Sequence, residues 1–415
     1  MAFQTVRGMR DFLPEQARKK QFIEDLCRRT FERYGFEPLQ TPILEDFALL
    51  SAKGSGGEAI KDEIYYFKDK GERELGMRYD LTVPLARIAA GNPSLPKPFK
   101  RYCVGTVYRY DRPQAKRYRE FTQADFDILG SKSVLSDFEI LNVACDVMRA
   151  LGLEFKVKVN NRKVLEELAK KCSVQETQVK DTFRAIDKLD KIGEKEVRRE
   201  LREKGIDDTI LGMIFTNSFD DVKAALGGAE CVEELGSLLD MCGRNGLVEV
   251  AFDLSLARGL EYYTGMVFEV ALESGPSVCG GGRYDRLAEA YGGQPTPALG
   301  GSFGIDRILD TIEKDIVMGK GTDIFIAAAS PEGQSEAIKI AARLRKAGTA
   351  VETDVMGRSV KNNIDYANRS GIGFFAAIGE DEIKRGTFRV KEMSSGREME
   401  FRLDDTAAIT ALLKG

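Results

Sequence analysis

Arginine is the side chain of this sequence best suited to chemistry, because none of the 415 residues is a histidine. Without histidine the chain cannot form Cys/His zinc sites, Ser-His-Asp triads or histidine acid–base pairs. If the chain is an enzyme, its catalysis must therefore use Arg, Lys, Tyr or carboxylates. The most cationic stretch runs from Lys97 to Arg119, where Asp111 is the only acidic residue. Such a local excess of positive charge suits the binding of phosphates or nucleic acid. The net charge of −4 for the whole chain neither predicts nor excludes nucleic-acid binding.

The composition is that of an ordinary soluble protein, with 43% apolar and 31% charged residues. This length predicts roughly two or three domains. The apolar stretches are too short to cross a bilayer, and the first residues lack the pattern of a signal peptide. The seven cysteines are scattered and form no Cys-x-x-Cys pair. We therefore expect a reducing compartment, the cytoplasm, and no structural zinc site.

The elements that must position these residues can be predicted from periodicity and turn residues. Over the first part of the chain we expect helices at 16–34 and 81–90, an extended segment at 37–45, and strands at 64–70, 74–79, 101–110, 121–129, 248–254 and 266–272. The strands at 101–110 and 121–129 should form a long antiparallel hairpin around a polar loop. Residues 164–247 have helical periods throughout and predict a helical insert. Glycine-rich turns are expected at 280–285 and 299–307.

The last part of the chain alternates between strands and helices. A polar linker at 314–322 precedes strands at 323–329, 350–353 and 374–378, a hairpin at 387–401, and helices at 332–347, 359–370 and 404–413. This alternation predicts a small α/β domain. We therefore expect two domains, 1–321 and 322–415.

Five segments resemble motifs of the histidyl-tRNA synthetase family, a class II aminoacyl-tRNA synthetase family. In chain order they are Gly8–Asp11, Arg78–Thr82, Tyr108–Gln123, Arg258–Glu269, and Gly281–Asp285 together with Gly304–Arg307. The Tyr108–Gln123 segment resembles class II motif 2, and the last pair resembles motif 3. The resemblance implies an α+β catalytic domain built on an antiparallel sheet, the class II synthetase fold. It also implies that 322–415 is an α/β anticodon-binding domain.

The resemblance also implies roles for individual residues. Arg258 and Arg109 would be catalytic. Histidine would be bound by Asp80, Leu81, Thr82, Gln123, Asp127, Tyr262 and Tyr263. ATP would be bound by Arg109, Asp111, Arg117, Phe121 and Arg307, and the acceptor end of tRNA by Arg112, Gln114 and Lys116. ATP would enter with Mg²⁺, and no organic cofactor or zinc-type metal ligand is expected.

These roles agree with the chemistry of amino-acid activation. The attacking carboxylate is already ionised, so the obstacle is repulsion between anions, which fixed arginines can offset. A carboxylate and a phenol, Asp127 and Tyr263, can satisfy both imidazole nitrogens. The simpler interpretations are that most arginines are solvated, that Tyr262 and Tyr263 are strand aromatics, and that Asp80 caps the helix at 81–90. The motif departs from the family at Asp306, usually Glu, and at Gly301, usually a larger apolar residue.

The implied function is ATP-dependent joining of L-histidine to tRNA(His). We also expect a homodimer, because 37–45 resembles motif 1, and no membrane partner. The alternative is a catalytically inactive relative that acts in regulation or tRNA sensing.

Overall fold

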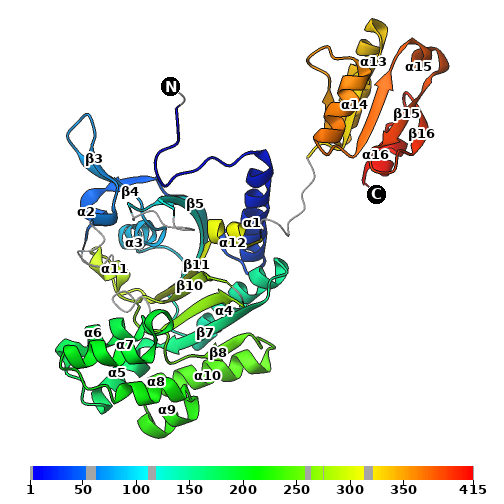
Figure 1. Cartoon of the computed structure of the whole chain (residues 1–415). Coiled ribbons are helices and arrows are strands. Elements are labelled where there is room, and N and C mark those ends of the chain that lie inside the picture. Colours follow the sequence, from blue (N-terminus) through cyan, green and yellow to red (C-terminus); the bar gives the residue numbers. More distant parts are fainter. Residues whose placement is uncertain are drawn as a thin grey trace. The chain divides into compact units, whose positions relative to one another are not determined.

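The computed structural model describes residues 3–52, 62–110, 118–257, 263–273, 275–312 and 321–414. The chain forms two compact units, Met1–Lys314 and Asp315–Gly415 (Figure 1). In the described part of the chain, no helix is long and apolar enough to span a membrane.

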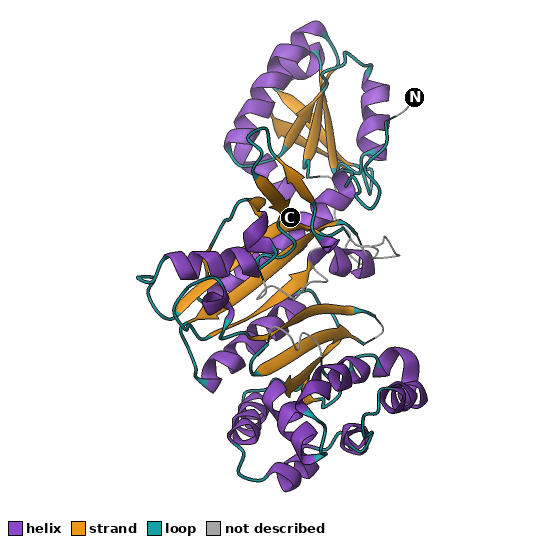
Figure 2. Ribbon diagram, turned by 90° about the vertical axis from the view of Figure 1, so that its left-hand side faces the viewer, coloured by secondary structure: helices purple, strands orange, loops and turns teal. Residues whose placement is uncertain are grey.

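The larger unit is built on a sheet of eight described strands (Figure 2). In spatial order these are β1 (Glu37–Pro38), β5 (Phe99–Tyr108), β6 (Glu120–Leu129), β11 (Ala298–Gly304), β10 (Ser277–Arg283), β9 (Met266–Leu272), β7 (Phe155–Asn161) and β8 (Val250–Phe252). The central pairings are all antiparallel, and only the outer pairs β1–β5 and β7–β8 are parallel. The expected hairpin is present, since Phe99 pairs with Leu129 and Tyr108 with Glu120.

Side-chain alternation along β6 separates the core from the functional face. On one face Phe126 stacks on Phe31 of α1 (Pro14–Arg33) with ring centroids 5.0 Å apart, and on Phe303 of β11 at 5.7 Å. Helix α1 packs against both α4 (Val134–Ala150) and α12 (Ile305–Ile312), and all three helices pack against this sheet. Burying each phenylalanine stabilises the unit by about 1.5–3 kcal/mol. Polar residues of β6 are thereby left for the other face.

Smaller elements complete the larger unit. A three-stranded sheet has the order β2 (Leu44–Asp46), β4 (Glu74–Met77), β3 (Tyr66–Lys68). Short helices nearby are α2 (Phe47–Leu50), α3 (Thr82–Gly91) and α11 (Leu287–Ala290). Between β7 and β8 lie α5 (Arg162–Lys171), the 3-10 turn Glu176–Gln178, α6 (Val179–Ile186), α7 (Leu189–Glu203), α8 (Ile210–Thr216), α9 (Phe219–Leu226) and α10 (Glu230–Arg244).

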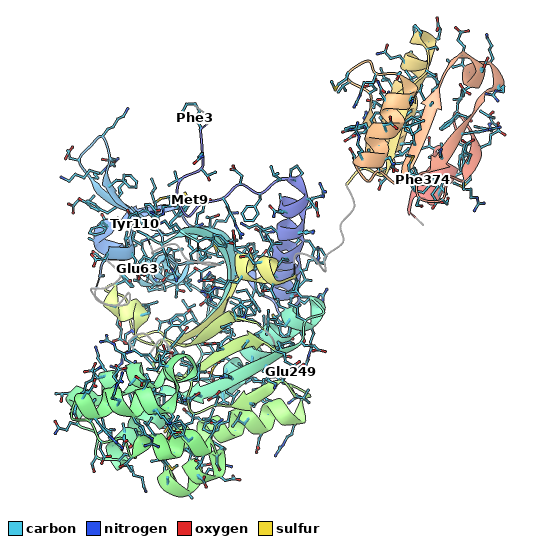
Figure 3. All side chains as sticks on the ribbon, in the orientation of Figure 1. Phe3, Met9, Glu63, Tyr110, Glu249 and Phe374 are labelled. Atoms are coloured by element: carbon cyan, nitrogen blue, oxygen red, sulfur yellow. The ribbon has the colours of Figure 1, made fainter. Side chains whose placement is uncertain are left out.

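A backbone hydrogen bond joins the chain before β3 to the chain after β5. The N–H of Tyr110 donates to the carbonyl oxygen of Glu63 at 2.7 Å, and both residues are labelled in Figure 3. The rings of Tyr65 and Tyr110 also meet edge to face, with centroids 5.2 Å apart. The end of the hairpin strand β5 is therefore held against the smaller sheet.

The smaller unit is an α/β sandwich. Its sheet has the order β13 (Val351–Thr353), β12 (Ile324–Ala328), β14 (Phe374–Ile378), β15 (Thr387–Glu392), β16 (Glu398–Arg402), with α13 (Pro331–Lys346), α14 (Val360–Arg369), α15 (Glu380–Arg385) and α16 (Thr406–Lys414). Ile324 and Ile326 pack with α13, whereas Phe325 and Ala327 pack with α14. Helices therefore cover both faces of β12. The expected fold class, an antiparallel catalytic sheet with a helical insert and a separate α/β unit, is confirmed.

Several details of the sequence-based prediction were wrong or missing. The glycine-rich segments expected as turns are the paired strands β10 and β11, with Gly281 opposite Gly301. Glycine is disfavoured in strands, so its clustering suggested turns. The strand at 248–254 is shorter than expected, only Val250–Phe252. Helix α4 and strand β7 were not predicted.

Candidate active site

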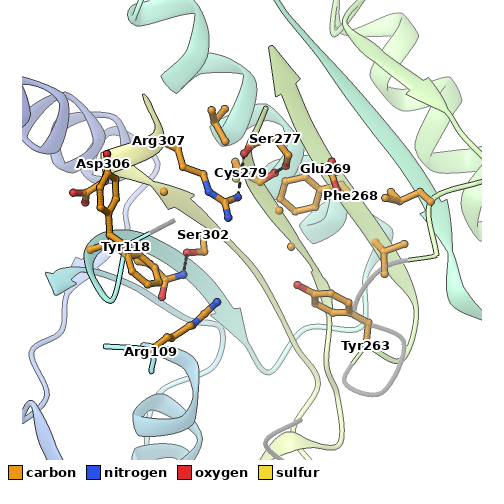
Figure 4. A pocket seen from close by; sticks show the side chains of 18 residues that line it. Arg109, Tyr118, Tyr263, Phe268, Glu269, Ser277, Cys279, Ser302, Asp306 and Arg307 are labelled. Carbon is orange, nitrogen blue, oxygen red and sulfur yellow. Dashed lines mark hydrogen bonds between the residues drawn. The ribbon is translucent and has the colours of Figure 1, made fainter. Parts of the chain in front are cut away.

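A cavity of about 280 Å³ opens on the polar face of the sheet, and 18 residues line it (Figure 4). They are Arg109, Tyr118, Phe121, Gln123, Leu256, Tyr263, Val267, Phe268, Glu269, Ser277, Val278, Cys279, Gly280, Gly281, Ser302, Gly304, Asp306 and Arg307. Five of them were predicted to bind substrates: Arg109, Phe121, Gln123, Tyr263 and Arg307. They come from the end of β5, from β6, from the segment before β9 and from α12, so the fold assembles them from distant parts of the sequence.

Two arginines supply the positive charge of the cavity. Arg109 follows β5, and its Nε donates to the carbonyl oxygen of Tyr79 at 3.0 Å. Its guanidinium lies 5.2 Å from the ring centre of Phe121. Arg307 lies on the exposed side of α12 and donates from Nη1 to the Ser277 carbonyl at 3.3 Å. Figure 4 shows both guanidinium groups directed into the cavity from different walls. A polyphosphate chain bound in the cavity could contact both guanidinium groups.

Asp80 both caps a helix and contributes charge near Arg109. Its Oδ1 accepts hydrogen bonds from the backbone N–H groups of Thr82 at 3.2 Å and Val83 at 2.9 Å. This capping orients α3. Burial raises the pKa of Asp80, and the positive charge of Arg109 opposes that shift. Asp80 therefore caps α3, as the sequence suggested. The same hydrogen bonds fix the position of its carboxylate, which the family resemblance assigns to the α-ammonium group of histidine.

Asp127 is held by two side chains. Arg101, which pairs with it across β5 and β6, places Nη2 2.7 Å from Oδ2. The hydroxyl of Tyr284 donates to Oδ1. Burial raises the pKa of Asp127, and Arg101 opposes this. Arg101 also donates to the carbonyl oxygen of Leu81 at 3.2 Å, so it links the two segments predicted to bind histidine.

Gln123 and Asp125 share the polar face of β6 with Asp127. The Gln123 amide donates from Nε2 to Ser302 Oγ at 2.6 Å (Figure 4). Ser302 is in turn hydrogen-bonded to Asp125. Burial raises the pKa of Asp125 to about 7, with Arg101 opposing and Asp127 adding to the shift. This face therefore holds two buried carboxylates beside one buried guanidinium, an arrangement that suits a ligand carrying positive charge or N–H donors.

Glycines in β10 and β11 let the strands approach closely. A Cβ at Gly281 would lie 2.1 Å from the carbonyl oxygen of Gly300. At Gly301 a Cβ would meet Cζ of Phe126 and Cζ of Phe268, each at 2.7 Å. A larger residue at position 301 would therefore require these two phenyl rings to move.

The cationic stretch from Lys97 to Arg119 is only in part a charged surface. Arg101 is 1% exposed and paired with Asp127. Lys100 lies 2.6 Å from Glu139. At least these two charges of the cationic stretch are therefore paired with carboxylates inside the fold.

The remaining predicted residues fall into two groups. Four residues do not line the cavity: Asp80 and Leu81, which directly precede α3, Thr82, which begins α3, and Asp127, which lies on β6. Asp111, Arg112, Gln114, Lys116, Arg117, Arg258 and Tyr262 lie outside the described residues. Cavity residues that the prediction missed include Tyr118, Glu269, Ser302 and Asp306. Tyr118, Glu269 and Asp306 lie within the motifs, so their position in the sequence could have identified them. Ser302 lies between two motif segments, and no feature of the sequence marked it.

A largely antiparallel sheet, a cavity lined by two arginines and a separate α/β unit are the features expected of a class II aminoacyl-tRNA synthetase. Comparison with known proteins agrees. Residues 8–308 match the family described as histidyl-tRNA synthetase, and residues 323–412 match the anticodon binding domain. The chain belongs to the histidyl-tRNA synthetase family, which confirms the resemblance of its motifs.

Individual relatives match over almost their whole length. A Bacillus cereus protein named histidine–tRNA ligase 1 is 37% identical, with 97% of this chain and 98% of the relative covered. A Methanocaldococcus jannaschii protein named histidine–tRNA ligase is 36% identical with the same coverage. The crystal structure of histidyl-tRNA synthetase from Nostoc sp. PCC 7120 is similar with a TM-score of 0.88, 30% identity, and coverage of 100% of this chain and 99% of that chain.

Proposed function

We propose that the protein is a histidine–tRNA ligase, which activates L-histidine with ATP and transfers it to the 3′ end of tRNA(His). The observation that carries this proposal is the meeting of Arg109, Gln123, Tyr263 and Arg307 in one cavity of a chain that matches the family over both units. We assign activation to residues 1–321 and anticodon binding to residues 322–415.

Activation needs no general base. The ionised carboxylate of histidine attacks the α-phosphorus of ATP, the bond to the β-phosphate oxygen breaks, and pyrophosphate leaves. Arg109 holds the α-phosphate and Arg258 offsets charge where carboxylate meets phosphate, so repulsion between the anions falls as the new bond forms. Arg307 binds the γ-phosphate end with the help of Arg117, and Asp111 also belongs to the ATP-binding residues. Phe121, already beside Arg109, stacks on adenine.

Mg²⁺ bound together with ATP would supply positive charge against the phosphates. Glu269 lines the cavity and offers carboxylate oxygens, the donor type that Mg²⁺ prefers. This residue is the described group best suited to contact the ion.

Histidine selection rests on the polar face beside the cavity. Asp127 and Tyr263 take the two imidazole nitrogens, and Tyr262 closes the pocket. Asp80, Thr82 and Gln123 take the α-ammonium group, and Leu81 belongs to the same histidine-binding segment. Because Asp127 is fixed by Arg101 and Tyr284, it cannot turn away when a substrate lacks matching nitrogens. A ligand without N–H donors would leave the remaining acceptor positions of this buried carboxylate and the Tyr263 hydroxyl without a ligand partner, which is costly, so other amino acids are rejected.

The partner is tRNA(His), whose acceptor end we place on Arg112, Gln114 and Lys116. We also propose a homodimer in the cytoplasm. Apolar side chains are exposed on and beside the three-stranded sheet, among them Ile43 at 41% and Tyr66 at 46%, and pairing of two chains would cover them. All seven cysteines are free thiols, six of them buried, which suits a reducing compartment.

The test is histidine-dependent exchange of labelled pyrophosphate into ATP. We expect exchange with histidine and none with the other amino acids. A folded protein without exchange would instead support the alternative, an inactive relative in regulation or tRNA sensing.

A further inference from the structure

The motif Gly8–Asp11 has no function in the mechanism above, yet it contacts the nucleotide end of the cavity. Arg10 donates from Nη1 to the hydroxyl of Tyr118 at 2.7 Å and to Oδ1 of Asp310 at 2.8 Å. From Nη2 it donates to Oδ1 of Asp306 at 2.9 Å. Tyr118 and Asp306 both line the cavity. One guanidinium from the N-terminal segment therefore connects two of its walls.

Asp306 extends this connection into the sheet. Its Oδ2 accepts the backbone N–H of Thr122, in β6, at 2.6 Å. Thr122 is next to Phe121, which is proposed to stack on adenine, and Asp306 is next to Arg307. The Asp306 carboxylate thus ties the start of β6 to the start of α12. At 4% side-chain exposure it is shielded from water, which strengthens these charge-assisted bonds.

The contacts on Tyr118 are equally specific. The Arg10 guanidinium lies 3.7 Å from the centre of the Tyr118 ring. The Tyr118 hydroxyl also donates to Oδ2 of Asp310 at 2.9 Å, which closes a ring of bonds with Arg10. Lys20 lies 3.7 Å from Asp306, so two cations face two carboxylates and the network is balanced in charge.

A second connection lies at Gly8. Its carbonyl accepts the backbone N–H of Arg119 at 2.8 Å, and the carbonyl of Arg119 accepts the N–H of Arg109 at 2.9 Å. Gly8 has a φ of +85°, and a Cβ there would lie 2.9 Å from the side chain of Arg119. Glycine is therefore required for this close approach. The backbone that carries Arg109 is joined through Arg119 to the N-terminal segment.

We propose that Arg10 is a positioning residue for ATP: it holds Tyr118 and the start of β6 against α12, and so sets the separation of Phe121 and Arg109 from Arg307. This inference rests on the proposed function for the identity of the ligand. It predicts that Arg10 affects ATP and hardly affects histidine, because the histidine-binding residues Asp80, Gln123 and Asp127 make no described contact with it.

The test is Arg10→Met in the full chain, measured by pyrophosphate exchange with ATP and histidine varied separately. We expect KM for ATP to rise about tenfold, the equivalent of about 1.4 kcal/mol, and KM for histidine to change less than about twofold. Calorimetric titration with ATP alone should give the same weakening. Arg10→Lys keeps the charge but not the two-pronged geometry, and should recover only part of the affinity.

Arg28→Met is the matched control. Arg28 lies on α1, also pairs with two carboxylates (Glu24 at 3.0 Å and Asp25 at 2.6 Å), and is 34% exposed against 25% for Arg10. It should lose a similar amount of stability and keep both KM values. If Arg10→Met does not fold, Tyr118→Phe, which removes the hydroxyl alone, should still raise KM for ATP a few-fold.

Wild-type affinity for ATP in folded Arg10→Met, or equal rises in both KM values, would overturn the proposal. An unchanged KM for ATP in Tyr118→Phe would do the same. Absence of exchange in the wild-type protein would instead count against the proposed function, and the calorimetric comparison would still decide the role of Arg10.

Discussion

The buried pair of Arg101 and Asp127 gives a prediction whose size follows from the structure. Their side chains are 1% and 4% exposed and 2.7 Å apart. At an effective dielectric constant of about 20, two unit charges at that distance attract by roughly 6 kcal/mol, part of which offsets desolvation. Removing one partner leaves the other charge buried. We expect Arg101→Met and Asp127→Leu each to lower the free energy of unfolding by about 3–5 kcal/mol.

The two changes should not be additive. The double variant Arg101→Met/Asp127→Leu leaves neither charge behind, so we expect it to recover at least about 2 kcal/mol of the summed loss. Asp125 also attracts Arg101, so Asp127→Leu should fall at the lower end of the range. Urea unfolding can be followed by circular dichroism, since the chain has no tryptophan, at one fixed protomer concentration. The two units must be fitted as separate transitions.

The same variants separate stability from recognition. If Asp127 binds the imidazole, the double variant should be folded but should bind histidine at least about tenfold more weakly than the wild-type protein does. Asp127→Asn should weaken histidine binding by about 1 kcal/mol or more, because it keeps an acceptor but loses the charge. A coupling free energy below about 1 kcal/mol would refute the ion-pair reasoning. An unchanged KM for histidine in both Asp127 variants would place the imidazole elsewhere.

Three further predictions concern separate parts of the molecule. Burial raises the pKa of Asp125 to about 7, above its unfolded value of about 4, so the contribution of Asp125 to stability should fall as pH rises from about 4 to about 7. Asp125→Asn should therefore be more stable than wild type at pH 8 and similar at pH 4 in thermal unfolding; an equal difference at both would contradict this. Arg258→Ala should lower kcat for pyrophosphate exchange with little change in KM, and near-normal exchange would make Arg258 structural. Deletion of Thr322–Gly415 should leave a folded protein that forms histidyl-adenylate but has a raised KM for tRNA and altered salt dependence; normal charging by a soluble, dimeric truncation would refute the anticodon-binding role.

Much of the fold could be predicted because periodicity and motif agree. The hairpin of β5 and β6 was clear from alternation on both sides of a polar loop, and α13 and α14 from regular apolar spacing. Strands β10 and β11 were misread because glycine signals turns locally, whereas here it permits close strand approach. Whether a glycine-rich segment forms a turn or a strand depends here on a neighbouring strand that is far away in the sequence.

The site was predictable only as far as the motifs reach. Arg109, Gln123, Tyr263 and Arg307 could be assigned because each stands in a motif, and the cavity brings them together. Arg101 could not be, since an arginine in a basic stretch gives no sign that it is buried against Asp127. Arg10 stood in a quoted motif, but its partners Tyr118, Asp306 and Asp310 are more than 100 residues away, and only the tertiary structure joins them.

The most direct test of the central claim is charging of tRNA(His) by the full-length protein, with each amino acid offered in turn alongside ATP. End-labelled tRNA transcript reports the aminoacyl ester at its 3′ end, and Arg109→Ala serves as the inactive control. We predict that histidine alone is attached to tRNA(His), and that omission of ATP abolishes the reaction. Charging with a different amino acid, or none by a folded protein that binds both ATP and tRNA(His), would contradict the account.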